Sequence, residues 1–209
     1  MKLLDTVRDI IRSFMHRIAV LLNTISGGKL SPNSVTIIGL LAHVPIALLI
    51  ATMHNVRAAV LLVVFGLFDT LDGELARLQK RDSSSGMLLD ASTDRMKEVL
   101  LYAGAAYAIT AGERPELAFW AVLACGASLV VSYVKAKGET AVAKTKLTTS
   151  EVNRLFQDGL MRFEVRMAVL VVGLLSNRLI LAVVVIAVSA SLTALWRLTT
   201  IMGRLRVQD

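Results

Sequence analysis

The chain has 209 residues, of which 55% are hydrophobic, with a net charge of +7 and a mean hydropathy of +0.64. This composition is too apolar for an ordinary soluble domain and favours an all-α integral membrane protein. The sequence shows no surface that combines basic and aromatic residues, so the positive charge indicates membrane topology and contact with anionic membrane lipids, and it excludes nucleic-acid binding.

Residues 1–25 predict an amphipathic juxtamembrane helix that lies in the membrane interface. Apolar residues recur there at helical spacing, and charged residues fill the opposite face. That charged face argues against a cleavable signal peptide. Glycine and proline residues break the chain after this helix, and Asn33 or Ser34 is expected to cap the next one.

Further segments are long and apolar enough to cross the hydrocarbon core, which requires about 20 helical residues. They are Val35–Asn55, Ala58–Arg77, Gly86–Thr110, Glu116–Lys135, Leu160–Ser176 and Leu179–Thr200. Residues 33–204 are therefore expected to form one domain of six transmembrane helices. Most basic residues fall on the side that an internal N-terminus makes cytoplasmic, and the opposite turns carry only Arg57, Arg114 and Arg178. The positive-inside rule thus predicts that both termini are cytoplasmic.

Four aspartates, Asp69, Asp72, Asp90 and Asp94, lie within this apolar sequence. On the predicted helices they share faces with small residues, and the last two follow Gly86 at i+4 and i+8. A charge at mid-membrane costs roughly 2.5–3.5 kcal/mol, so four would cost on the order of 10 kcal/mol. Divalent cations offset this cost, and an all-oxygen site suits two ions of Mg²⁺ or Mn²⁺ that act on a phosphate.

Salt bridging and solvation at helix ends are the alternative explanation of these acidic residues. A pair between Asp94 and Lys97 is one example, but such pairs do not account for the whole set. The alternative remains open for Glu74, Asp82 and Glu98.

The full spacing is D-x2-D-G-x2-A-R-x8-G-x3-D-x3-D, and it closely resembles the signature of the CDP-alcohol phosphotransferases, which are six-helix membrane enzymes. The positions are Asp69, Asp72, Gly73, Ala76, Arg77, Gly86, Asp90 and Asp94. The resemblance extends over nearly the whole chain and implies a homodimer in the inner membrane, with residues 33–204 as the catalytic domain and a cytoplasmic active site.

The resemblance also implies roles for individual residues. Asp69, Asp72 and Asp90 would hold two metal ions, and Asp94 would touch the second ion. As general base, Asp94 would deprotonate an acceptor hydroxyl that attacks the lipid-bearing phosphate of a CDP-lipid and releases CMP. The expected CDP-lipid-binding residues are Asn33, Ser34, Val35, Thr36, Gly73, Ala76, Arg77, Ser83 and Gly86.

Three cations near the predicted cytoplasmic level, Lys135, Arg166 and Arg197, lie on three different spans and suggest a shared anionic ligand. They resemble the acceptor-phosphate site of the phosphatidylinositol-phosphate synthase branch. The lysine stretch is kept as SYVKAK, whereas Phe163 stands where that branch has an arginine. Inositol 1-phosphate is the expected acceptor, and glycerol 3-phosphate is the nearest competitor.

Two other classes bind divalent metal through intramembrane acids. Membrane prenyltransferases carry two separated aspartate-rich motifs on a larger bundle, and this chain has one cluster. Metal transporters usually place their acids near the midplane between pseudo-symmetric halves. No second half with matching acids is present in the sequence.

Overall fold

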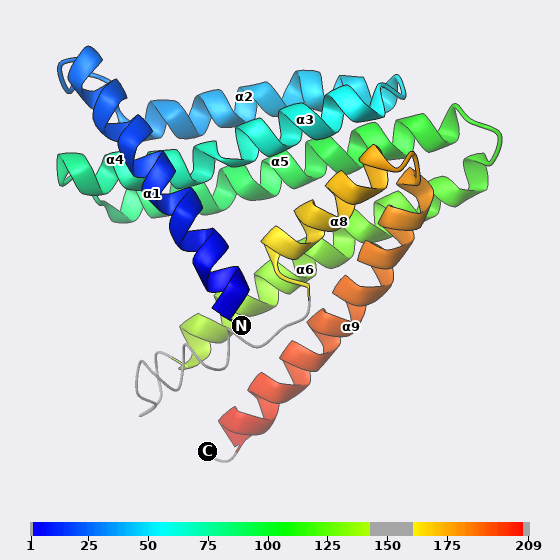
Figure 1. Cartoon of the computed structure of the whole chain (residues 1–209). Helices are drawn as coiled ribbons and strands as arrows, with labels where there is room; N and C mark the ends of the chain where they lie inside the picture. The colour runs from blue at the N-terminus through cyan, green and yellow to red at the C-terminus, as the bar shows by residue number, and fades with distance from the viewer. Residues whose placement is uncertain (1, 143–160, 207–209) are drawn as a thin grey trace.

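The computed structural model describes the backbone of residues 2–142 and 161–206, with side chains from residue 11 onward. This part of the chain is all-helical, as predicted (Figure 1). The elements are α1 (Lys2–Ile25), α2 (Pro32–Ala51), α3 (Asn55–Gly66), α4 (Phe68–Gln79), α5 (Ser84–Thr110), the 3-10 helix η1 (Pro115–Leu117), α6 (Ala118–Val142), α8 (Phe163–Leu175) and α9 (Leu179–Arg206).

Among the described residues, three helical stretches are long and apolar enough to cross a membrane: Pro32–Ala51, Pro115–Val142 and Leu179–Arg206. The expected second span is divided at Leu67 into α3 and α4 of 12 residues each, or about 18 Å apiece. Helix α5 is long but carries the charged residues, and α8 has only 13 residues. The three long apolar helices agree with the predicted membrane protein. That the chain crosses the membrane six times stays a prediction.

The start of α2 differs from the prediction. Ser31 is the N-cap, and its Oγ accepts a hydrogen bond from the backbone N–H of Ser34 at 3.1 Å. The expectation that Asn33 or Ser34 caps this helix was wrong. Pro32 occupies the first turn, where its missing N–H costs no hydrogen bond, so the helix begins earlier than the polar residues alone suggested.

The helices form a bundle in which α2 packs along α5 and α6 packs along α9. Helix α5 also contacts α6, and α8 lies between α3 and α9. The α2–α3, α5–α6 and α8–α9 turns lie toward one end of the bundle, and the α4–α5 turn lies at the other (Figure 1). Gly104 on α5 meets the backbone carbonyl of Ala47 on α2, where no Cβ fits. This close contact places the first half of α2 beside the aspartates of α5.

Helix α1 crosses α4 on the outside of the bundle (Figure 1). Met15 and Ala19 are buried from its apolar face. They belong to a small core with Val35 of α2 and with Leu71 and Leu75 of α4. The amphipathic pattern thus provides a packing face against α4, and the location of α1 in the membrane interface stays a prediction.

Candidate active site

The four aspartates lie on α4 and α5, which are joined by a short reversal. Lys80 ends α4 in the left-handed conformation, with a φ of 52°. Ser83 begins α5 as its N-cap, since its Oγ accepts a hydrogen bond from the N–H of Gly86 at 3.1 Å. Because so few residues separate the helices, α4 folds back along the start of α5, and Asp72 of α4 lines the same cavity as Asp90 of α5.

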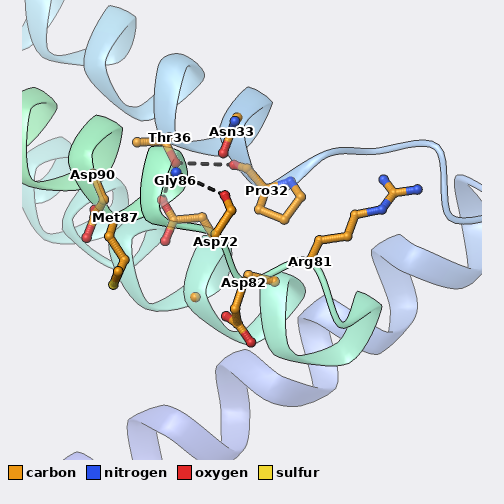
Figure 2. A pocket seen from close by; sticks show the side chains of 12 residues that line it. Pro32, Asn33, Thr36, Asp72, Arg81, Asp82, Gly86, Met87 and Asp90 are labelled. Carbon is orange, nitrogen blue, oxygen red and sulfur yellow. Dashed lines mark hydrogen bonds between the residues drawn. The ribbon is translucent and has the colours of Figure 1, made fainter.

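A cavity of about 120 Å³ opens between the starts of α2 and α5 and the end of α4 (Figure 2). Its lining includes two of the aspartates and most of the residues expected to bind the CDP-lipid. These are Asp72, Asp90, Asn33, Thr36, Gly73, Ala76, Ser83 and Gly86. Residues from three separate helices are therefore gathered at one place.

Other residues expected to bind the CDP-lipid lie outside this lining. Ser34 hydrogen-bonds Ser31 within the cap of α2, and Val35 is buried in the core beneath α1. The cavity is also lined by Arg81 and Asp82 of the α4–α5 turn, which were not among the predicted site residues (Figure 2). Their position directly before Ser83 was the available signal.

Thr36 and Asp72 point toward each other across the cavity (Figure 2). The Thr36 hydroxyl lies 2.5 Å from Oδ2 of Asp72 and 3.2 Å from the carbonyl of Pro32. With only one proton to donate, the hydroxyl favours the shorter, charge-assisted bond. Asp90 is different, because its Oδ1 is buried and has no hydrogen-bond partner among the described residues.

Asp69 and Asp94 share the ammonium group of Lys97. The Nζ atom lies 2.5 Å from Oδ1 of Asp69 and 3.2 Å from Oδ1 of Asp94. The lysine side chain is 1% exposed, whereas the two carboxylates are 23% and 17% exposed. The suggested Asp94–Lys97 pair is therefore present, and Lys97 also reaches across to the other helix.

As arranged, no three His, Cys, Asp or Glu side chains within residues 11–142 and 161–206 are grouped to hold one ion. Two of the carboxylates are occupied by Lys97, and a third accepts from Thr36. The donor set nevertheless fits Mg²⁺ or Mn²⁺, since it consists of carboxylate oxygens on facing helices. The buried, unpartnered oxygen of Asp90 is the kind of atom that a cation would satisfy.

Arg77, expected to bind the CDP group, points to a different partner. Its Nη2 donates to Oε1 of Glu74 at 2.5 Å. Glu74 is buried and also accepts from Arg12 at 2.9 Å, while its other oxygen lies 3.1 Å from Nδ1 of His16. The salt-bridge explanation left open for Glu74 is the one that the structure supports, and it ties α1 to α4.

The three expected acceptor residues lie on α6, α8 and α9. Lys135 is half-exposed, with Nζ 3.8 Å from Glu139. Arg166 is 1% exposed and pairs with Glu98 through Nε at 2.7 Å and Nη2 at 3.0 Å. Arg197 is buried and donates to the carbonyl of Val131 at 3.3 Å, while its Nε has no hydrogen-bond partner in the part of the chain that the structure describes.

Arg166 and Arg197 are both buried, on helices α8 and α9 that pack against each other. The joint role of Lys135, Arg166 and Arg197 stays a prediction. Glu98 is another residue whose salt-bridge explanation the structure supports.

Arg95 connects the two parts of the site and was not predicted. Its Nη1 donates to Glu98 at 2.7 Å and to Ser132 at 2.6 Å, and its Nη2 lies 3.6 Å from Asp94. The guanidinium also stacks 5.0 Å from the ring of Phe163. Its place directly after Asp94 was the only sequence signal.

Comparison with known proteins identifies the same family that the aspartate signature resembles. A family model described as CDP-alcohol phosphatidyltransferase matches residues 29–196. The phosphatidylinositol phosphate synthase of Corynebacterium glutamicum is 39% identical over 114 residues, which cover 53% of this chain and 52% of that protein. The archaetidylinositol phosphate synthase of Methanothermobacter thermautotrophicus is 31% identical over 138 residues, covering 66% and 65%. The chain spans about half the length of the phosphatidylinositol phosphate synthases that it matches.

Solved structures of Mycobacterium tuberculosis phosphatidylinositol phosphate synthase, PgsA1, are similar over most of the chain. The structure with CDP-DAG bound has a TM-score of 0.76 at 26% identity, covering 90% of this chain and 92% of that one. The complex with manganese and citrate has a TM-score of 0.77 at 26% identity, covering 90% and 88%. With two of its signature aspartates lining one cavity and the family model spanning most of its length, the chain belongs to the CDP-alcohol phosphatidyltransferase family.

Proposed function

We propose that the protein is a phospholipid-synthesis enzyme of the membrane. It transfers a diradylglycerol-phosphate group from a CDP-lipid of the CDP-diacylglycerol type to a hydroxyl of a phosphorylated polyol, and CMP is released. The observation that carries this proposal is the cavity that Thr36 of α2, Asp72 of α4 and Gly86 of α5 line together. The similar structure with CDP-DAG bound supports the donor.

In this proposal Asp69, Asp72 and Asp90 hold two divalent ions, and Asp94 contacts the second. The bound ions supply positive charge to the phosphates, as in other two-metal sites. The M. tuberculosis complex with manganese supports divalent metal as the cofactor. Thr36 fixes the orientation of Asp72 through their hydrogen bond.

Asp94 is the proposed general base. Its carboxylate accepts the proton of the acceptor hydroxyl, and the freed oxygen forms a bond to the phosphorus that bears the lipid. The bond from that phosphorus to the bridging oxygen breaks, and CMP leaves with the electron pair. Arg95 and Lys97 lie on either side of the Asp94 carboxylate and hold it in place.

The proposed acceptor is inositol 1-phosphate. Relatives named phosphatidylinositol phosphate synthase and archaetidylinositol phosphate synthase support it, and so does the cation group of Lys135, Arg166 and Arg197. Within this group Arg197 has the buried, unpartnered Nε that an anion would satisfy. Glycerol 3-phosphate is the alternative acceptor. At position 163 the resemblance implies an arginine, but this chain has Phe163, whose ring packs against the guanidinium of Arg95.

The enzyme is proposed to cross the inner membrane six times as a homodimer, with residues 33–204 as the catalytic domain. Residues 1–25 would lie at the membrane surface. Both termini and the active site would be cytoplasmic, in keeping with the positive-inside pattern. The three apolar stretches and the family membership support the membrane location.

The test is CMP release by the purified protein in detergent, with CDP-diacylglycerol and Mg²⁺ or Mn²⁺. Inositol 1-phosphate, glycerol 3-phosphate, serine and free inositol are supplied in parallel. Release with inositol 1-phosphate alone, lowered about 10²–10⁴-fold in Asp94→Asn, is the expected result. Release with another acceptor only would correct the substrate.

Protein that binds CDP-lipid without releasing CMP would redirect the search to ether lipids and other alcohols. Absence of CDP-lipid binding would contradict the enzyme reading. Metal flux in proteoliposomes would then support a divalent-metal transporter.

A further inference from the structure

Lys97 is a lysine enclosed at the centre of an acidic site. Its ammonium bridges Asp69 of α4 and Asp94 of α5, and the side chain is almost fully buried. On the third side it lies against α2, where a Cβ built on Gly39 would come within 4.0 Å of both Cε and Nζ. The ammonium group of Lys97 is therefore a buried component of the acidic site, in contrast to a lysine on the protein surface.

The position of this charge has an energetic consequence. Four carboxylates facing each other at the membrane edge repel strongly when no cation separates them. Lys97 supplies one positive charge that Asp69 of α4 and Asp94 of α5 share, and Asp94 also lies 3.6 Å from the guanidinium of Arg95. Lys97 therefore stabilises the arrangement of α4 against α5 before any metal arrives.

The same contact opposes metal binding. A divalent ion that uses oxygens of Asp69 and Asp94 must approach the atoms on which the ammonium now lies, and like charges repel at such distances. We propose that Lys97 is an internal counter-cation that stabilises the metal-free site and competes with the divalent ion for Asp69 and Asp94. This inference rests on the metal site of the proposed function, and it makes Lys97 a positioning residue that sets metal affinity.

Two effects of opposite sign follow when the charge at this position is removed. The metal-free protein loses stability, because Asp69 loses the ammonium that pairs with it and Asp94 keeps only the more distant guanidinium of Arg95. Divalent metal binds more tightly, because the ion no longer displaces an ammonium. If Lys97 only filled space between α4 and α5, its substitution would lower both the stability of the metal-free protein and its affinity for divalent metal.

The experiment measures Mn²⁺ binding to the full chain in detergent, from the electron paramagnetic resonance signal of free Mn²⁺, without any substrate. Lys97→Gln is expected to bind Mn²⁺ about tenfold more tightly than the wild type, equivalent to about 1.4 kcal/mol. Its thermal midpoint in chelator is expected to fall below that of the wild type and to be restored by Mn²⁺. Lys97→Arg, which keeps the charge, should bind Mn²⁺ no more tightly than the wild type.

Lys29→Gln is the matched control, since it removes an exposed lysine in the α1–α2 turn and should change neither quantity. Equal or weaker Mn²⁺ binding by Lys97→Gln would overturn the inference and leave the proposed enzyme intact. A wild type that binds no Mn²⁺ would overturn the metal site itself, and the inference with it.

Discussion

Arg166 of α8 and Glu98 of α5 form a two-pronged ion pair in the interior of the bundle, with Nε–Oε1 and Nη2–Oε2 distances of 2.7 and 3.0 Å. Both side chains are almost completely buried, and the third guanidinium nitrogen donates to the carbonyl of Met161 at 2.7 Å. Arg166 thus has a fixed orientation before any acceptor binds. The charge of Arg166 is balanced by Glu98. Among the described residues of the acceptor group, Arg197 is the buried cation that has a guanidinium nitrogen without a hydrogen-bond partner.

Glu98→Gln is expected to destabilise the protein by about 3–5 kcal/mol, because removing one partner of a buried ion pair leaves the other charge uncompensated. Two cations, Arg95 and Arg166, would then lie around a neutral amide. Thermal or chemical unfolding in detergent measures the change. Glu139→Gln, at a half-exposed carboxylate on α6, is the control that should leave stability nearly unchanged. Equal midpoints for the two variants would show that the ion pair contributes little.

Arg197→Ala is expected to raise the KM for the acceptor about tenfold or more while changing the KM for the CDP-lipid less than twofold. A charge-assisted hydrogen bond to a phosphate contributes about 1.5–3 kcal/mol, and this residue lies on α9, away from the cavity between α2, α4 and α5. Steady-state kinetics with each substrate varied in turn measure the split. Arg204→Ala, at an exposed arginine of the same helix, should alter neither value.

Arg166→Ala is expected to change the kinetics in the same direction as Arg197→Ala. In protein that remains folded, the KM for the acceptor should rise far more than the KM for the CDP-lipid. Proportional increases of both KM values in either variant would remove these arginines from the acceptor pocket. The expected loss of stability in Arg166→Ala is read separately from unfolding, since Glu98 is left buried without its main partner.

Thr36→Val is expected to lower kcat/KM for the CDP-lipid about tenfold, because it removes the hydrogen bond that orients Asp72 and keeps the shape of the side chain. Thr36→Ser restores the hydroxyl and should recover most of the activity. Thr199→Val, at an exposed threonine of α9, is the control. Wild-type kinetics in Thr36→Val would mean that Asp72 needs no partner from α2.

The features of this site that depend on residues close together in the sequence could be predicted from the sequence. Asp90 and Asp94 follow each other at helical spacing, so their shared face on α5 depends only on the geometry of one helix. The expected spans Ala58–Arg77 and Gly86–Thr110 leave only a short reversal between them, and this reversal brings Asp72 to the same cavity as Asp90. Helix periodicity and a short turn were sufficient for these predictions.

The ion pairs between distant segments were not accessible in the same way. Arg12 and Glu74 are 62 residues apart, and Glu98 and Arg166 are 68 apart. Periodicity says which face of a helix is polar, but not which helix covers it. The break at Leu67 was missed for a related reason, since the apolar run continues through the end of α3 and hides the interruption between α3 and α4.

Gly104→Ala is expected to destabilise the protein by about 1–3 kcal/mol, although alanine normally favours a helix over glycine by about 1 kcal/mol. The reason is the contact with α2, where a Cβ on Gly104 would overlap the carbonyl of Ala47 and push the helices apart. Gly126→Ala on α6 is a matched control, because a Cβ there meets nothing within 4 Å and the change should be neutral or stabilising. Unfolding midpoints of the two variants in detergent make the comparison. Because α2 and α5 also carry Thr36 and Asp90, the CDP-lipid KM of Gly104→Ala should rise as well. A Gly104→Ala protein as stable as Gly126→Ala would mean that α2 and α5 are not in close contact at this position.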